Sequence, residues 1–185
     1  MYESIKYIKL QADVMKAYDK KMYGSAFDWK YVKFETYDQK SQGITNGYFI
    51  MFIPEDMFLL DRDKVFAPNT IDGNRFIDAA IKNSYKAFNT GIVMDKFINS
   101  KKIKLREIKV DNPEGDVTLL DDALASKYFD LSVCSLKTTG KKAPVLLYEG
   151  DILTAASTTN IKTTSEIILL IFISYAPSFV KINIL

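Results

Sequence analysis

The stretch Pro144-Val145-Leu146-Leu147-Tyr148-Glu149-Gly150-Asp151-Ile152 decides the fold class of this chain. An apolar run that follows a proline is typical of a buried strand. Glu149-Gly150-Asp151 has the composition of a tight turn that reverses the chain. The segment therefore predicts a hairpin of two strands, 144–149 and 152–156, and with it an antiparallel sheet.

Segments upstream of this hairpin continue the pattern. Residues 84–96 and 103–110 predict two further strands, and Asn112-Pro113-Glu114-Gly115 predicts a turn after them. Asp121 or Asp122 can cap a helix that ends near Phe129. Residues 131–136 then predict another strand. The C-terminal half is thus expected to contain strands, a helix and more strands.

The N-terminal half has a similar expected order. Residues 4–10 predict a strand, and Val14, Ala17 and Tyr18 recur at helical spacing within a helix over 11–22. Two strands, at 29–37 and 48–53, are expected to pair as a hairpin across a turn-rich connection at 41–47. The remaining expectations are one helical turn in 54–61, a loop at 68–73 and a helix at 75–83.

These elements predict an α+β fold of mostly antiparallel sheet with two or three helices. The element order also allows two similar strand-helix-strands halves. A length of 185 residues is most simply one domain, 1–185, and lobes 1–83 and 84–185 are the alternative division.

The C-terminal segment 167–173 is uncharged and apolar. Seven residues are too few to cross about 30 Å of hydrocarbon, so no membrane partner is expected. Such a segment has to be buried, either inside the molecule or against a second copy. A homodimer through the C-terminal strand is therefore one expectation.

The composition excludes several kinds of active site. The chain has no histidine and one cysteine, Cys134, so Ser-His-Asp and Cys-His arrangements, a zinc site and a disulfide are not expected. We expect no enzyme activity, no cofactor and no metal. A single thiol and an N-terminus without an apolar signal core indicate the cytoplasm of a bacterial host. A net charge of +2 argues against mimicry of nucleic acid by the whole surface.

Asp95 and Glu107-Ile108-Lys109 are the one candidate for catalysis. An aspartate and a Glu-x-Lys on neighbouring strands resemble the Mg²⁺-binding set of restriction-type nucleases. An acidic residue two positions before a lysine arises by chance about three times in a chain of this composition. A Mg²⁺-dependent nuclease with Asp95, Glu107 and Lys109 is therefore the third-ranked function.

Two groups of charged residues are candidate binding surfaces. The acidic groups lack the spacing of a calcium loop, so they are candidates for contact with a protein. The basic groups can attract phosphate or shield an exposed strand edge. The candidate protein contacts are Tyr31, Tyr37, Tyr48, Asp56, Asp61, Asp63, Asp111, Glu114 and Asp116, and the candidate nucleic-acid contacts are Lys101, Lys102, Lys104, Arg106, Lys109, Lys141 and Lys142.

Two resemblances to known protein families reduce the range of candidate functions. The segment Lys142-Ala143-Pro144 to Asp151, with its proline, apolar strand and acidic hairpin, resembles the end of a DNA sliding-clamp module. The size, the Lys-, Ile-, Asn- and Tyr-rich composition and the lack of catalytic residues resemble accessory proteins of phages and mobile elements, among them inhibitors of CRISPR effector nucleases (anti-CRISPR proteins).

We therefore expect a non-enzymatic protein that binds a macromolecule. The first expectation is an inhibitor that docks on a Cas nuclease with its guide RNA and blocks target DNA engagement or cleavage. The alternative is a clamp-like DNA-binding replication accessory. Because lysine is a poor tool for reading bases, any contact with nucleic acid is expected to be weak and independent of sequence.

Overall fold

The structure is a computed structural model that describes residues 4–22, 29–33, 41–46, 49–67, 70–72, 80–98, 101–141 and 143–157. Its elements follow the chain as α1 (Ile5–Met22), β1 (Lys30–Lys33), β2 (Ser41–Thr45), β3 (Phe49–Pro54), the 3-10 helix η1 (Glu55–Met57), α2 (Arg62–Val65), β4 (Thr70–Asp72), β5 (Tyr85–Ile98), β6 (Lys101–Val110), β7 (Val117–Asp121), α4 (Asp122–Tyr128), β8 (Ser135–Thr138), β9 (Val145–Glu149) and β10 (Ile152–Ser157).

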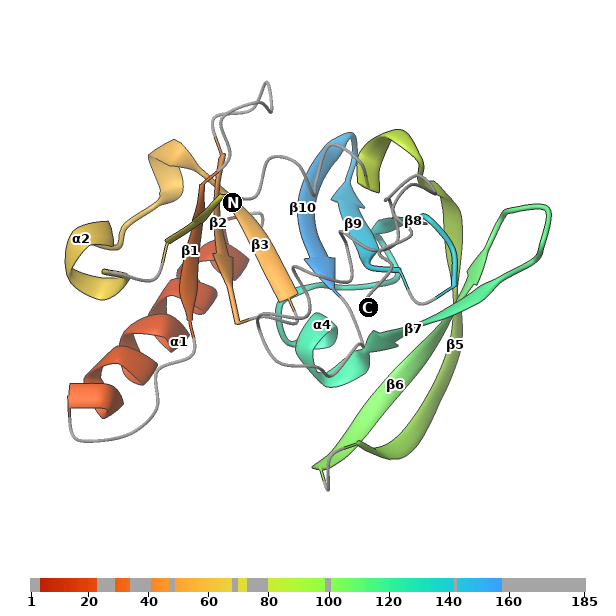
Figure 1. The fold of residues 1–185 in the computed structure, drawn as a ribbon, viewed down its shortest axis with the longest axis horizontal. Coiled ribbons are helices and arrows are strands. Elements are labelled where there is room, and N and C mark those ends of the chain that lie inside the picture. Colours follow the sequence, from red (N-terminus) through yellow and green to blue (C-terminus); the bar gives the residue numbers. More distant parts are fainter. Residues whose placement is uncertain are drawn as a thin grey trace, which may run out of the picture.

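Ten strands form one sheet in the order β4-β1-β2-β3-β10-β9-β8-β5-β6-β7 (Figure 1). Neighbouring strands are antiparallel, except that β4 runs parallel to β1. Helix α1 precedes the meander β1-β2-β3, and helix α4 precedes the meander β8-β9-β10. The last strands of the two meanders, β3 and β10, pair with each other. The expectation of an α+β fold with a mostly antiparallel sheet is confirmed.

One face of the sheet carries a continuous row of buried side chains. Cross-strand partners share a face of a sheet, so the register identifies the members of this row. They run from β1 to β6 as Tyr31, Ile44, Met51, Ala155, Leu147, Leu136, Ala87 and Val110. We call this the core face of the sheet.

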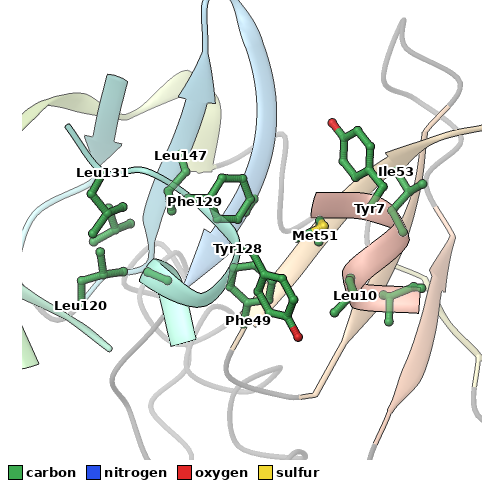
Figure 2. Close-up of a cluster of buried hydrophobic side chains, with 14 of the residues drawn as sticks. Tyr7, Leu10, Phe49, Met51, Ile53, Leu120, Tyr128, Phe129, Leu131 and Leu147 are labelled. Carbon is green, nitrogen blue, oxygen red and sulfur yellow. The ribbon is translucent and has the colours of Figure 1, made fainter. Parts of the chain in front are cut away.

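Helices α1 and α4 cover the core face. Tyr7 and Leu10 of α1 pack into the same core cluster as Phe49 and Met51 of β3, and Tyr128 at the end of α4 joins them (Figure 2). The Phe49 ring stacks on the Tyr128 ring with centroids 5.8 Å apart. The core therefore contains residues from both sides of position 83.

A smaller cluster covers the opposite face of the sheet. Phe52, Leu146 and Tyr148 lie there, with Ala80 and Ile81 packed against them. Residues 80–82 are helical, as expected for the end of a helix at 75–83. Burial on both faces explains why β9 is an almost unbroken apolar run.

Polar contacts join α1 to α4 and to β9. The Asp13 carboxylate accepts hydrogen bonds from Lys127 Nζ at 2.7 Å and from Tyr128 Oη at 2.9 Å. Burial acts to raise the pKa of Asp13, but these two donors outweigh it and lower the pKa. The buried Lys6 ammonium forms an ion pair with Glu149.

Several sequence expectations are confirmed. Strands β5, β6, β9 and β10, helix α4 and the turn at 112–115 form where they were expected. The 149–151 hairpin turn joins β9 to β10, and Gly150 adopts φ +60, which favours glycine.

Other expectations are wrong. Residues 5–10 are not a strand but the start of α1, because Tyr7, Leu10 and Val14 fall on one helical face and are buried. Residues 41–45 form β2 between the two expected hairpin strands. Residues 70–72 form β4, and 131–133 are a turn before β8. The apolar segment 167–173 lies outside the described residues.

Candidate macromolecule-binding surface

Strands β5 and β6 form a two-stranded ribbon that extends past the rest of the sheet (Figure 1). Strand β8 pairs with β5 only over 85–87, and β7 pairs with β6 only over 105–109. Beyond these positions the two strands pair only with each other. We call residues 93–98 and 101–106 the arm; its last two residues, Leu105 and Arg106, also pair with β7 and form its base.

The register assigns each arm residue to a face. Val93 lies opposite Arg106, Asp95 opposite Lys104 and Phe97 opposite Lys102. These residues continue the core face, because side chains two apart in a strand share a face. The core face of the sheet thus extends along the arm beyond its pairing with β7 and β8.

Apolar side chains are exposed along β5. Phe97 is 77% exposed, Phe88 53%, Ile92 51% and Val93 42%. Phe97 is the most exposed of the large hydrophobic side chains in the described residues. Isolated apolar side chains on a surface are normal, but several on one projecting strand are typical of an interaction site.

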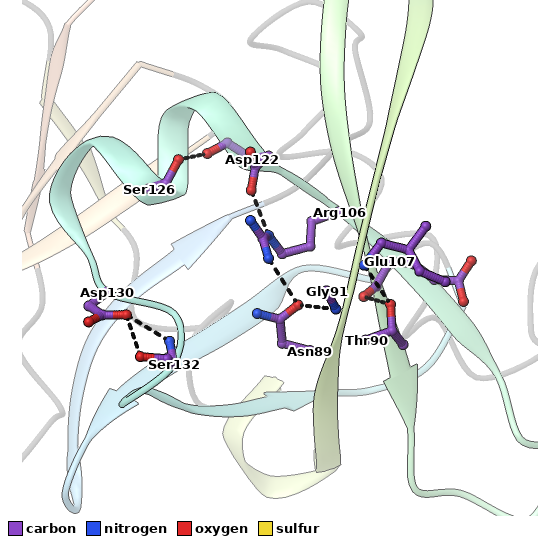
Figure 3. A network of polar contacts seen from close by, with 10 residues as sticks. Asn89, Thr90, Gly91, Arg106, Glu107, Asp122, Ser126, Asp130 and Ser132 are labelled. Atoms are coloured by element: carbon purple, nitrogen blue, oxygen red, sulfur yellow. Dashed lines mark hydrogen bonds and ion pairs between the residues drawn. The ribbon is translucent and has the colours of Figure 1, made fainter.

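A bulge at 90–92 separates the arm from the base of β5. Gly91 adopts φ +75, and its N–H donates to Asn89 Oδ1 at 2.9 Å. Thr90 Oγ1 donates to the carbonyl of Glu107 at 3.0 Å (Figure 3). Three residues of β5 here face one residue of β6, which bends the strand and increases its twist.

Arg106 is part of the framework and is not a free cation. Its Nε donates to Asp122 Oδ1 at 2.6 Å, and its Nη1 donates to Asn89 Oδ1 at 3.4 Å (Figure 3). Arg106 therefore joins the base of the arm to the first turn of α4. This occupies the guanidinium that was a candidate for nucleic-acid contact.

The remaining basic candidates do not form one patch. Lys102 and Lys104 are exposed and share the arm's core face, and Lys102 Nζ lies 2.9 Å from Asp95 Oδ2. Lys109 pairs with Phe88 on the opposite face. Lys141 is exposed beside the 111–116 loop, where its N–H donates to Asp116 Oδ2. The side chain of Lys101 and all of Lys142 lie outside the described residues.

The nuclease arrangement expected from Asp95, Glu107 and Lys109 does not form. Asp95 shares the face of Arg106, whereas Glu107 is the next residue along an unbroken strand and points to the opposite face (Figure 3). Asp95 instead pairs with Lys102, and this hydrogen bond lowers its pKa. In the described part of the chain, no three His, Cys, Asp or Glu side chains are placed to hold a metal ion.

Tyr31 is wrong as a surface contact, because it is buried in the core. Only 7% of it is exposed, its hydroxyl donates to Gln42 Oε1 at 3.2 Å, and its ring lies against Phe58 and Phe66. Burial raises the pKa of this phenol. Tyr37 and Tyr48 lie outside the described residues.

The acidic candidates occur in two separate places. One group belongs to η1 and α2 near one end of the sheet, and the other belongs to the loop between β6 and β7 near the opposite end (Figure 1). Asp61 caps α2 by accepting from the Lys64 N–H, and Asp116 accepts from Asn112 Nδ2. The exposed members are Asp56, Asp61, Asp63, Asp111 and Glu114.

Sequence reasoning missed the apolar part of this surface. Val93 falls inside the expected strand 84–96 and Phe97 just beyond it, and neither is among the predicted contacts, although Phe97 lies in a segment with four lysines between positions 96 and 104. An aromatic residue among lysines near a hairpin turn is the signal that could have identified it. The sequence could not show that β5 and β6 extend beyond their neighbours β8 and β7.

Comparisons with protein-family models, with curated proteins and with solved structures find no match to this chain. None of the helices in the described residues has the length and apolar character needed to span a membrane.

Proposed function

We propose that this protein acts by binding a macromolecule rather than by catalysis, and that the arm is its principal contact surface. The observation that carries the proposal is the exposed face of Phe97 and Val93 on a ribbon that projects from the sheet. A projecting ribbon can enter a groove or channel of a partner that the body of the sheet cannot reach.

The partner that we propose is a CRISPR effector nuclease with its guide RNA, inhibited by a phage or mobile-element protein. Such a complex presents nucleic acid to its surroundings, and the arm carries exposed lysines beside its apolar residues. A protein docked there blocks target DNA engagement or the movement of the nuclease domain.

The test compares two double variants that alter opposite faces of β5 and β6. Phe97→Ser/Lys104→Glu changes the face proposed to bind, and Phe88→Ser/Lys109→Glu makes the same chemical changes on the other face. Each protein is immobilised and exposed to a purified Cas9–guide RNA complex, and inhibition of plasmid cleavage is measured in parallel.

We expect the wild type and the Phe88/Lys109 variant to capture the complex and slow cleavage, and the Phe97/Lys104 variant to do neither. Equal capture by both variants would show that the arm is not the contact. Absence of capture and inhibition by the wild type would exclude this nuclease as the partner.

A clamp-like DNA-binding accessory is the second candidate, and a specific observation favours it. A helix followed by a three-stranded meander occurs twice, and the sheet order β1-β2-β3-β10-β9-β8 is symmetric about the β3–β10 pair. Two similar halves with both helices on one face are the pattern expected of a sliding-clamp domain.

The hypothesis of a clamp-like accessory and the hypothesis of a nuclease inhibitor make different predictions. Several copies would be needed to surround DNA, so light scattering should give a closed oligomer, and the protein should stay longer on circular than on linear duplex DNA. A monomer that leaves both DNA forms equally fast would exclude a clamp.

A further inference from the structure

This inference rests on the arm being the binding surface, and it names the occupant of that surface. We propose that the core face of the arm binds single-stranded nucleic acid, with a base stacked on the ring of Phe97 and phosphates held by Lys102 and Lys104.

The Phe97 ring is available for stacking. It is 77% exposed, and its cross-strand neighbour on the same face is Lys102 rather than another apolar residue. A base in a single strand has a free face, whereas a base in a duplex is already stacked on both sides. Stacking on one aromatic ring strengthens binding of a strand by about 5- to 150-fold.

The two lysines are placed to bind phosphates next to that base, along the strand opposite Phe97. Lys102 lies directly opposite Phe97, and Lys104 lies two residues further along the same strand and face. Residues directly opposite in a sheet have Cβ atoms about 4.5–5.5 Å apart, within reach of adjacent groups of one nucleotide. Arg106, which could read a base edge, is occupied by Asp122. Binding should therefore depend little on sequence.

Asp95 competes with the ligand for Lys102. Its Oδ2 lies 2.9 Å from Lys102 Nζ, and Asp95 also lies opposite Lys104. A phosphate has to displace this carboxylate, which also repels it. Removal of the charge in Asp95→Asn should therefore strengthen binding, an effect that a purely structural role for the ion pair would not produce.

The same two residue types supply a matched control on the other face. Phe88 lies opposite Lys109, and Phe88 is 53% exposed. Phe88→Ala and Lys109→Gln thus repeat the changes Phe97→Ala and Lys102→Gln without touching the proposed site. All four positions are exposed, so the variants are expected to fold, and circular dichroism checks this.

The experiment measures fluorescence anisotropy of a fluorescein-labelled 20-nucleotide oligothymidylate, with a 20-base-pair duplex as competitor. We expect Phe97→Ala to weaken binding at least about fivefold and Asp95→Asn to tighten it. Two phosphate contacts on a single strand predict a roughly sevenfold loss of affinity between 50 and 200 mM salt, and Lys102→Gln should reduce that loss.

A second measurement reports stacking directly. Phe97→Trp should retain binding, and its fluorescence should be quenched by the oligothymidylate. The wild type is the blank, because its only tryptophan, Trp29, packs against the core.

The outcomes separate this inference from the proposed function. Tighter binding of the duplex, or equal effects of the Phe88 and Phe97 variants, would overturn the inference. If no oligonucleotide binds but capture of the nuclease complex still depends on Phe97 and Lys104, the occupant is a protein surface and only the inference fails. If neither occurs, the proposed function fails as well.

Discussion

Asp13 of α1 forms hydrogen bonds that join this helix directly to α4. It accepts hydrogen bonds from Lys127 and Tyr128, and 22% of its side chain is exposed. Burial of Tyr128, followed by its bond to Asp13, raises the pKa of that phenol far above its usual range. The carboxylate is therefore held in its charged form by α4.

Asp13→Asn should destabilise the protein in a pH-dependent way. The pKa of Asp13 is lowered in the folded state, so its contribution is present above the ordinary pKa of 3.8 and is lost as the pH falls through the folded value. We expect a cost of about 1.5 kcal/mol near pH 7 that shrinks toward pH 2.5. Urea unfolding at several pH values measures it, with the exposed Asp63→Asn as control. A cost that stays constant with pH would contradict this account.

Gly150 is the position where the 149–151 turn depends on glycine. Its φ is +60, and a Cβ added there would meet nothing within 4 Å, so only backbone strain opposes substitution. Gly150→Val should cost about 1–2 kcal/mol, and Gly150→Asn less, since asparagine tolerates this conformation. Thermal unfolding of both variants tests the order. Equal losses would indicate a cause other than the backbone.

Elements were predicted well where a residue pattern is local and poorly where neighbours impose the structure. The β9–β10 hairpin has its turn and apolar strands in one short segment, and it was predicted correctly. Strand β2 was missed because Ser41 and Gly43 favour a turn, but β1 and β3 pair with it on both sides. Tertiary context overrides propensity in such a strand.

The N-terminal helix was misassigned for a related reason. Lys6 and Lys9 interrupt the apolar residues of 5–10, and this interleaving of charged and apolar residues resembles a short strand. The structure buries Tyr7, Leu10 and Val14, whereas Ile5 and Ile8 are both 53% exposed. A helical period was present, and two exposed isoleucines concealed it.

The arm should be removable without loss of the fold. Replacement of residues 95–104 by Asn-Gly joins the paired residues Met94 and Leu105 through a two-residue turn that suits a hairpin. Since the removed residues pair only with one another, we expect the free energy of unfolding to change by less than about 1 kcal/mol. Chemical denaturation of the shortened chain measures this. A large loss would show that the arm supports the core.

The molecule as a whole should unfold in one step. The core face runs without interruption from β1 to β6, and α1 and α4 pack into the same cluster. Two natural probes lie on either side of position 83. Trp29 reports the N-terminal part by fluorescence, and the half-buried Cys134, whose pKa burial raises, reports the C-terminal part by its rate of alkylation.

Both probes should give the same urea midpoint, because neither part keeps its core without the other. The exposed residues of the arm do not affect either probe, so the arm-shortened chain is a suitable comparison. Two separate midpoints would favour independent lobes 1–83 and 84–185 over one domain.

The pairing of β3 with β10 lay beyond sequence reasoning. Nothing in the composition of Phe49–Pro54 or Ile152–Ser157 specifies the partner strand, because both are simply apolar strands. The pairing is a long-range contact between two segments about 100 residues apart, and the two meanders share the core cluster that contains α1 and α4. For the same reason the edge strands of the sheet could not be predicted from the residues.

The β3–β10 pair also has a consequence during synthesis on the ribosome. Strand β10 leaves the ribosome about 100 residues after β3. At about 5–20 residues per second, β3 has no partner on that side for roughly 5–20 seconds. An apolar strand with an unpaired edge can template aggregation, so we expect the nascent chain to be exposed to aggregation through β3 during this interval.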